Sequence, residues 1–477
     1  MSASTPRVVV IGLDCLTPQL LFDRWLDDLP TFKRLVDAGT FGKLKSVHPP
    51  ITVPAWSCMM SGYEPAQLGL YGFRHRKTGT YTEKYFARSN NVHKPRVWQH
   101  LTQAGFTSGV LGVPQTYPVK KLKGFLVSGF LAPSTDAVFT FPDKLREEME
   151  AVVGEYLIDV KNFRADDRDR ILEEIHEMTD RRFKVFRHFI DHRPCDFMMM
   201  VEMGSDRIHH AFWRFTDPDH PKFEAGNPYE HAVKNYYEQL DREIAATIEL
   251  LDDDCHVLIV SDHGARPMIG GFAINDWLQQ QGLLTMKERS REEAATFREE
   301  DVDWSKTKVW AWGGYYARVF LNVEGREPQG QIPAAQLDEF IADLTSKLEA
   351  IVDPDGHPMG NVVMRPEETT SARVAHGDAP DLMVYFGDLA YRSIGSLHHP
   401  SLYVESNDTG PDDANHDHYG ILVHTTMGDV RSGRPGGMER DDMRLIDVGP
   451  TILSLFGLKT PEDAAGTPMT WIDGVDA

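Results

Sequence analysis

The sequence has few cysteines and no long apolar run. Its 477 residues include only four cysteines, and these lie far apart in apolar, core-like contexts: Cys15, Cys58, Cys195 and Cys255. This pattern is typical of buried free thiols rather than of a disulfide framework. No stretch approaches the roughly 20 apolar residues that span a bilayer, and the start MSASTPR lacks the features of a secretory signal. We therefore expect a cytoplasmic protein without a membrane span.

Positive charge is also scarce. The chain has 50 Lys and Arg against 72 Asp and Glu, which gives a formal net charge of -22. Duplex nucleic acid and anionic membranes both need a basic surface to neutralise their phosphates, so we expect neither as a partner. A small phosphorylated substrate would need local positive charge, which bound divalent metals can supply. The sequence does not predict an oligomeric state.

Apolar runs followed by acids recur along the chain. With 41% hydrophobic residues the chain can bury a large core. The runs at 7–13, 196–202 and 256–260 are typical of strands buried on both faces of a parallel sheet, and they lead to Asp14, Asp206 and Asp262. Ligands of open α/β sheets collect at the carboxyl ends of strands, which favours one shared site.

Helical patterns alternate with these strands, at 18–38, 142–153, 166–191 and 229–252. The alternation predicts a doubly wound α/β fold with one dominant core and insertions. We assign to this core the segments 1–73, 191–283 and 381–477. Segment 74–190 is expected to be a cap or insertion with some core elements, and 284–380 a smaller α+β excursion with a strand at 361–364. The charged stretch 287–306 is predicted to be a solvated helix or loop.

Two short motifs carry candidate metal ligands. In SDRIHH, Asp206 and His210 are four residues apart, so on a helix both would project from one face. Asp262 and His263 follow the buried strand at 256–260 and could both point into a cleft. Each motif also has a purely structural interpretation: Asp206 as a helix cap beside a surface histidine, and Asp262-His263-Gly264 as a turn.

A hydroxyl and a third histidine complete the set. Thr52 lies between two prolines in PPITVPAWS, directly before a helical pattern at 55–61, so a helix cap is an equally good local interpretation. The loop at 406–415 leads to His416 and His418, of which one could bind a metal. Two metals beside a hydroxyl are suited to phosphoryl transfer, with the hydroxyl as nucleophile. The candidate residues are Asp14, Thr52, Asp206, His210, Asp262, His263 and His416. Their mixed nitrogen and oxygen ligands suit Zn, although Mn or another divalent ion remains open.

The chain resembles the alkaline phosphatase superfamily, in particular its type I phosphodiesterase/nucleotide pyrophosphatase branch and the soluble prokaryotic members of that branch. The resemblance covers nearly the whole chain and rests on these blocks: VVVIGLDC, LPTFKRLVDAGTFGKLKSVHPPITVPAWSCMMSG, SDRIHHAFW, VLIVSDHG, APDLMVYFGDLAYRS, NHDHYGILV and DVGPTILSLFGL. It implies a three-layer core with a central, mostly parallel sheet and an inserted cap.

The resemblance also implies roles. Asp14, Thr52, Asp262 and His263 would surround one metal, and Asp206, His210 and His416 the other. His416, four residues before Gly420, matches the family position better than His418. The mechanism would pass through a phosphothreonyl intermediate at Thr52 and break phosphodiester or pyrophosphate bonds.

Some features depart from the family pattern. Ala55 stands where nucleotide pyrophosphatases have an Asn that helps to hold phosphate. The Arg74-His75-Arg76 cluster could supply charge, but a solvated basic turn is the simpler interpretation. Trp56 could stack on a base, although core packing explains it as well.

Other functions stay open at this point. A phosphomonoesterase, a phosphotransferase or mutase of the same superfamily, and a catalytically silent metal-binding protein all remain possible. A sulfatase does not fit, because its C/S-x-P-x-R pattern is missing. Substrate choice is expected to depend on the cap, at about 74–190 with a contribution from 284–380.

Overall fold

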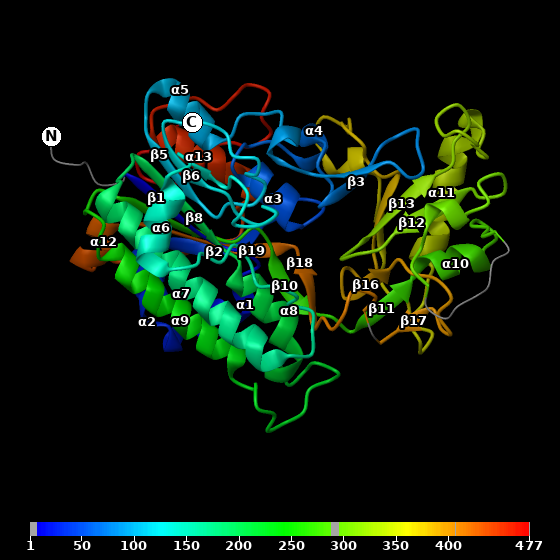
Figure 1. The fold of residues 1–477 in the computed structure, drawn as a ribbon, viewed down its shortest axis with the longest axis horizontal. Coiled ribbons are helices and arrows are strands. Elements are labelled where there is room, and N and C mark those ends of the chain that lie inside the picture. The colour runs from blue at the N-terminus through cyan, green and yellow to red at the C-terminus, as the bar shows by residue number, and fades with distance from the viewer. Residues whose placement is uncertain (1–6, 288–294, 406, 477) are drawn as a thin grey trace.

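A nine-stranded sheet forms the centre of the molecule (Figure 1). The computed structural model describes residues 7–287, 295–405 and 407–476. Five neighbouring strand pairs are parallel and three are antiparallel. From edge to edge the strands are β20 (Met438–Arg440), β2 (Thr40–Lys45), β19 (Tyr419–Thr426), β9 (His256–Val260), β1 (Val8–Leu13), β8 (Phe197–Glu202), β5 (Ser108–Leu111), β6 (Gly124–Val127) and β7 (Thr140–Phe141).

The three predicted strands lie side by side in the middle of this sheet. β1 pairs in parallel with β8 on one side and β9 on the other, and Gly12 is opposite both Val201 and Val260. Every residue of β1 and β8 is buried, as a strand covered on both faces requires. Because the three strands are in register, their carboxyl ends meet at one edge.

Helices cover both faces of the sheet, which makes three layers (Figure 1). One face carries α2 (Pro30–Ala38), α7 (Arg168–His192), α8 (Gly204–Thr216) and α9 (Ala232–Ile248), with α6 (Leu145–Val153) packed on α7. The other face carries α3 (Thr52–Met59), α5 (Val97–Ala104) and α13 (Val448–Leu455). The fold is therefore the predicted α/β fold with a central, mostly parallel sheet between helices.

One predicted helix is interrupted. The pattern at 18–38 forms α1 (Pro18–Leu21), a 3-10 helix at Leu26–Asp28 and then α2. Pro30 starts α2 at its first position, where a missing N–H has no cost, but a proline could not continue an earlier helix. The apolar spacing was correct for the buried face, and the break at Pro30 was missed.

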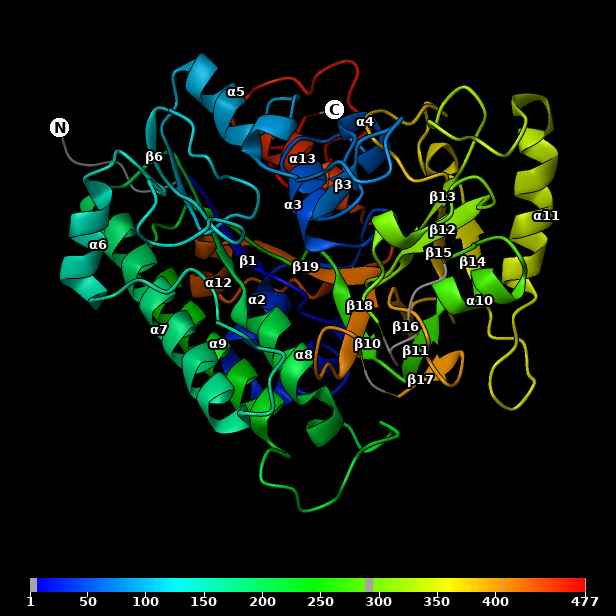
Figure 2. The same ribbon diagram turned by 45° about the vertical axis from the view of Figure 1, so that its right-hand side comes forward.

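A small lobe packs beside the sheet, at the right of Figures 1 and 2. We define it by its two sheets and two helices. The first sheet has β12 (Val309–Trp312), β13 (Ala317–Leu321), β15 (Leu382–Tyr385) and β14 (Val362–Met364); the second has β16 (Tyr391–Ile394), β11 (Gly270–Ala273) and β17 (Tyr403–Val404). The helices are α10 (Ile274–Gln280) and α11 (Leu337–Glu349). The lobe has an apolar core of its own, so it is a structural unit rather than a loop.

Short elements join the two parts. β10 (Gly264–Pro267) pairs with β18 (Ala414–Asp417), and the hairpin of β3 (Arg74–Arg76) and β4 (Lys84–Phe86) lies against the small lobe. Two further short helices are α4 (Pro65–Leu68) and α12 (Met427–Ser432). The stretch 287–306 lies partly outside the described residues. Its described end is not solvated as predicted, since Glu299, Val302 and Trp304 are buried.

The four cysteines are free and buried, as the sequence predicts. Within the described residues, no helix combines the length and the apolar character that crossing a bilayer requires.

Candidate active site

Two clusters of buried acids and histidines lie at the carboxyl edge of the central strands. Asp14 follows β1, the α8 residues Asp206 and His210 follow β8, and Asp262 and His263 follow β9. His416 comes from β18, which pairs with β10 so that His416 is opposite Ala265. This pairing stacks the His416 ring on the His263 ring, with 3.8 Å between centroids.

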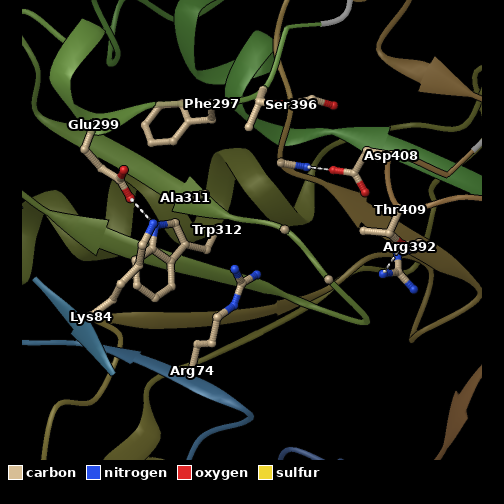
Figure 3. A pocket seen from close by; sticks show the side chains of 14 residues that line it. Arg74, Lys84, Phe297, Glu299, Ala311, Trp312, Arg392, Ser396, Asp408 and Thr409 are labelled. Atoms are coloured by element: carbon tan, nitrogen blue, oxygen red, sulfur yellow. Dashed lines mark hydrogen bonds and ion pairs between the residues drawn. The ribbon is translucent and has the colours of Figure 1, made fainter. Parts of the chain in front are cut away.

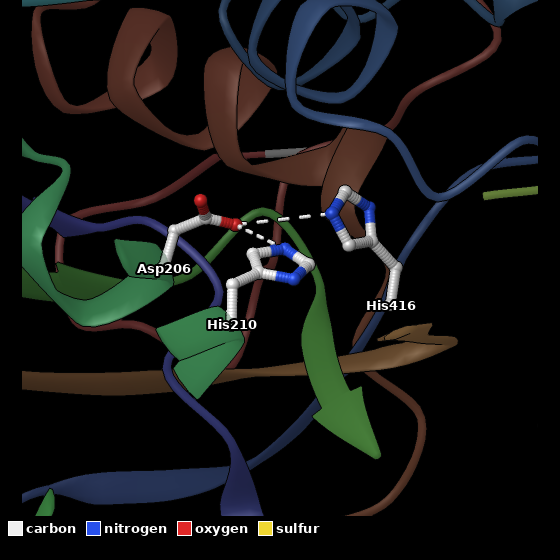
Figure 4. Close-up of side chains that lie close together, drawn as sticks. All are labelled: Asp206, His210 and His416. Atoms are coloured by element: carbon white, nitrogen blue, oxygen red, sulfur yellow. Dashed lines mark ion pairs between the residues drawn. The ribbon is translucent and has the colours of Figure 1, made fainter. Parts of the chain in front are cut away.

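The His210 cluster consists of Asp206, His210 and His416 (Figure 4). Asp206 Oδ1 lies 3.2 Å from His210 Nε2 and 3.8 Å from His416 Nε2. All three side chains are buried. Asp206 and His210 share one face of α8, and helix α8 begins at Gly204 with Met203 as its cap. The alternative of a capping Asp beside a surface histidine is therefore wrong.

The His263 cluster consists of Asp14, Asp262 and His263. His263 Nε2 lies 3.3 Å from Asp262 Oδ2 and 3.7 Å from Asp14 Oδ1. The hydroxyl of Thr52 reaches the same nitrogen, with 3.4 Å between Oγ1 and Nε2. Thr52 thus joins the His263 cluster, and all seven predicted residues come together.

Thr52 is not a helix cap. Helix α3 begins at Thr52 itself, its cap residue is Ile51, and no side chain makes a capping hydrogen bond. The helix starts three residues earlier than the predicted 55–61 because Pro54 is accommodated in its first turn, where proline is tolerated. The buried hydroxyl therefore points at His263 instead of bonding its own backbone.

The outer atom of each of the six acids and histidines has a fixed partner. Three of these partners are side chains: Trp56 Nε1 donates to Asp14 Oδ2 at 2.7 Å, Arg207 pairs with Asp206 Oδ2, and His210 Nδ1 bonds Asp412 Oδ1 at 2.7 Å. The backbone holds the other three, through Cys15 N–H to Asp262, the Gly264 carbonyl to His263 and the Pro50 carbonyl to His416. Such outer contacts orient metal ligands in proteins.

Most of the inner atoms have no such partner. Among the described residues, four buried atoms that face the clusters make no hydrogen bond: Asp14 Oδ1, Asp206 Oδ1, Asp262 Oδ2 and His416 Nε2. Leaving buried carboxylate oxygens unpaired is costly unless a cation satisfies them. Carboxylate oxygens and imidazole nitrogens are also the donors that zinc and manganese accept. The residues present therefore fit two divalent metals.

Electrostatics supports the same conclusion. Burial raises the pKa of Asp14 and of Asp262 well above the usual range, and neighbouring carboxylates add to both shifts. Burial lowers the pKa of His263 to about 4, so this ring is neutral and can offer a lone pair. Close carboxylates resist ionising together unless positive charge lies between them, and two metal ions would supply that charge.

Comparison with known proteins identifies the family. A family model for type I phosphodiesterase/nucleotide pyrophosphatase matches residues 8–412. The chain belongs to this family. The family is part of the alkaline phosphatase superfamily, and the chain is an enzyme of the metal-dependent, phosphodiester- and pyrophosphate-hydrolysing type. A search among curated proteins found no match.

Solved structures of the superfamily share the fold. Phosphonoacetate hydrolase from Sinorhizobium meliloti 1021, in complex with phosphonoformate, matches 94% of this chain and 97% of its own, with a TM-score of 0.59 and 16% identity. An inactive murine ectonucleotide pyrophosphatase/phosphodiesterase 5 in complex with AMP covers 98% of both chains, with a TM-score of 0.55 and 13% identity. The human protein of that name covers 98% of this chain and 100% of its own, with a TM-score of 0.53 and 13% identity.

Three local predictions about this phosphodiesterase-family chain are now resolved. His418 lies outside the clusters, where its Nε2 bonds Asp388 at 2.8 Å. Trp56 is buried in the core, as expected, but it also holds Asp14. The interpretation of residues 74–76 as a solvated basic turn is wrong: Arg76 is buried against Glu327, and only Arg74 is exposed.

Sequence reasoning missed the residues that support the ligands. Asp412 holds His210, while Tyr315 stacks on His416 with 3.9 Å between centroids. Asp412 was read only as part of a loop rich in Pro, Gly, Asp and Asn, and no local pattern distinguishes it from Asp413. Tyr315 comes from the small lobe, 101 residues before His416, and no short motif connects the two.

Proposed function

We propose that this enzyme hydrolyses phosphodiester or pyrophosphate bonds through a phosphothreonyl intermediate at Thr52, with two bound divalent metals. The observation that carries the proposal is the position of the buried Thr52 hydroxyl, which does not cap its helix. It lies 3.4 Å from His263 Nε2, beside inward-facing atoms that lack hydrogen-bond partners. A hydroxyl in such surroundings is suited to nucleophilic attack.

The proposed ligands follow the two clusters. Asp14, Asp262, His263 and Thr52 would hold one metal, and Asp206, His210 and His416 the other. Zinc suits this donor set best, and manganese is the main alternative. When bound, the cations would lower the pKa of the Thr52 hydroxyl and neutralise charge on the phosphoryl oxygens.

The protein's own groups then carry the reaction. The Thr52 oxygen attacks phosphorus, the bond to the leaving oxygen breaks, and the phosphoryl group is transferred to Thr52. Water then cleaves the phosphothreonine, which releases the product and restores the hydroxyl. Thr52 and Val53 start α3, so their N–H groups have no acceptor within the helix and can bind phosphoryl oxygens in place of the missing Asn.

The direct test compares the wild-type enzyme with Thr52→Ala on bis-p-nitrophenyl phosphate in the presence of zinc. We expect kcat to fall at least about 10³-fold, because the nucleophile is lost. Metal content and circular dichroism should remain close to those of the wild type. Chelation by EDTA should also abolish the wild-type activity. Unchanged turnover in Thr52→Ala would refute the nucleophile assignment.

The same assay separates the related activities. p-Nitrophenyl phosphate tests for a monoesterase, and product analysis with an added alcohol tests for phosphotransfer. A protein that binds two metals yet hydrolyses none of these esters would be the catalytically silent alternative. The cytoplasmic location stays a prediction. We also propose that segments 74–190 and 284–380 supply the contacts that select the substrate.

A further inference from the structure

We use the name cleft for two adjoining pockets at the small lobe, of which the inner one is lined by Tyr315. Tyr315 marks its inner end, where the ring stacks on His416 and the phenolic oxygen lies 3.3 Å from His210 Nε2. Asn415, next to His416, holds the backbone carbonyl of Tyr315 at 3.1 Å. Ile51, which precedes Thr52, also lines this inner pocket of about 210 Å³. A group in the pocket would therefore lie close to the proposed nucleophile.

Arginines dominate the inner pocket. Four of its described lining residues are arginines and none is an acid; the arginines are Arg74, Arg164, Arg318 and Arg392. Asp412 lies behind the wall and binds Arg164 at 2.7 Å and Arg392 at 3.0 Å. The same carboxylate also holds His210. One carboxylate therefore serves two guanidinium groups and a histidine, and the wall retains excess positive charge.

Two of the four arginines have no acidic partner among the described residues. Arg318 donates only to backbone carbonyls, those of Arg74 at 2.6 Å and Gly313 at 3.4 Å, and its buried Nε makes no hydrogen bond. Arg74 is exposed, and Figure 3 shows its guanidinium pointing into a neighbouring pocket that it also lines. Burial lowers the pKa of Arg318 and of Arg392. Positive charge is thus unfavourable here until an anion compensates it.

An outer pocket, drawn in Figure 3, adjoins the inner pocket. Arg74, Arg392, Gly313 and Gly314 line both the inner pocket and the outer pocket of about 300 Å³. A Cβ on Gly313 would lie 2.4 Å from the backbone nitrogen of Gly395, so this position requires a residue without a side chain. The ring of Trp312 forms one wall and is held by its Nε1 hydrogen bond to Glu299 at 3.1 Å. This outer part has room for an organic group.

We infer that the cleft binds a second anionic group, a carboxylate or a phosphate, on an ester substituent of the substrate. The inference rests on the proposed function, because the phosphoryl group must lie at Thr52 for its substituent to enter the cleft. Guanidinium groups pair with carboxylates and phosphates through two parallel hydrogen bonds, which suits arginines that lack an acid. The excess of positive charge in the inner pocket stands out in a chain with a formal net charge of -22, whereas the outer pocket also has the acids Glu299 and Asp408 in its lining.

The test uses three diesters that differ only in this substituent: p-nitrophenyl phenyl phosphate and its 4-carboxyphenyl and 4-phosphonooxyphenyl analogues. For the wild type with zinc, we expect kcat/KM to be about tenfold higher for at least one anionic ester than for the phenyl ester, as one charge-assisted contact can provide. The better of the two anionic esters shows whether the site takes a carboxylate or a phosphate. Calorimetric dissociation constants in Thr52→Ala should follow the same order.

Arg74→Gln and Arg318→Gln should each reduce the anionic preference several-fold. Arg74→Gln keeps the test valid if Arg318→Gln fails to fold, because Arg74 is exposed. Lys77→Gln is the matched control: it removes an exposed cation three residues away that pairs with Glu83, and it should leave the preference unchanged. Equal efficiency for all three esters, or a preference that survives both arginine variants, overturns the inference alone. No p-nitrophenolate from any ester overturns the proposed function and the inference with it.

Discussion

The metal clusters and the arginine-lined cleft differ in how their charges are compensated. In the clusters each acid and histidine has a second partner that fixes its outer atom, such as Trp56 for Asp14 or Asp412 for His210. In the cleft, Arg74 and Arg318 have no acidic partner among the described residues. The first arrangement holds ligands rigidly for one kind of chemistry. The second leaves charge that, in our proposal, a substrate neutralises, so the proposed chemistry and the proposed substrate choice fall to different parts of the molecule.

The largest effect is expected from a variant that removes a ligand of the His210 cluster. In His416→Ala we expect kcat/KM to fall about 10³-fold and the bound metal to drop from two ions to one, because only Asp206 and His210 remain as ligands. Metal content by elemental analysis and hydrolysis of bis-p-nitrophenyl phosphate measure both changes.

His418→Ala is the matched control for that variant. His418 is two residues away and bonds Asp388 outside the clusters, so activity should change less than about threefold and both metals should remain. If the two variants behaved alike, the assignment of His416 but not His418 to the metal clusters would be wrong.

A smaller effect is expected from Asp412→Asn, which tests the residue that the clusters and the cleft share. Loss of the charge behind His210 should weaken zinc binding about 10- to 100-fold, measured by competition with a chelator. Asp413→Asn is the control, since its carboxylate faces Arg214 at 3.6 Å and should leave zinc affinity unchanged. Because Arg164 and Arg392 also lose their counter-charge, circular dichroism must verify folding, and Asp412→Glu replaces the variant if it unfolds. Unaltered affinity would show that His210 is oriented by other groups.

The smallest effect is expected from Trp56→Phe. The phenyl ring preserves most of the packing but removes the hydrogen bond to Asp14 Oδ2. A hydrogen bond to a charged group contributes about 1.5 kcal/mol or more, so kcat/KM should fall about tenfold while KM changes little. Trp98→Phe, at another buried tryptophan on α5, should leave activity unaltered. Equal losses in the two variants would indicate general destabilisation instead.

Much of the fold could be predicted because its central strands have a clear sequence pattern. The runs that form β1, β8 and β9 are apolar throughout, since both faces are covered, and each leads to an acid at the same edge of the sheet. The helices α6, α7 and α9 follow from their apolar spacing. The pattern at 18–38 predicted one continuous helix, because apolar spacing alone does not show that a new helix begins at Pro30.

The candidate residues of the site were also readable, because Asp206 with His210 and Asp262 with His263 form short motifs. The residues that contact these ligands could not be predicted in the same way. Trp56 was interpreted as a packing residue, although its indole also donates to Asp14. Asp412 and Tyr315 reach the clusters from distant segments, and single-sequence patterns record only neighbours along the chain.

The sequence by itself determined the α/β class, the family and the seven residues expected to carry the chemistry, because those properties depend on local periodicity and short motifs. Only the tertiary structure decided that Thr52 starts a helix without capping it, that His418 is excluded, and that four arginines from distant segments share one pocket. The physical reason is that charge compensation depends on distances between side chains, and chain folding sets those distances.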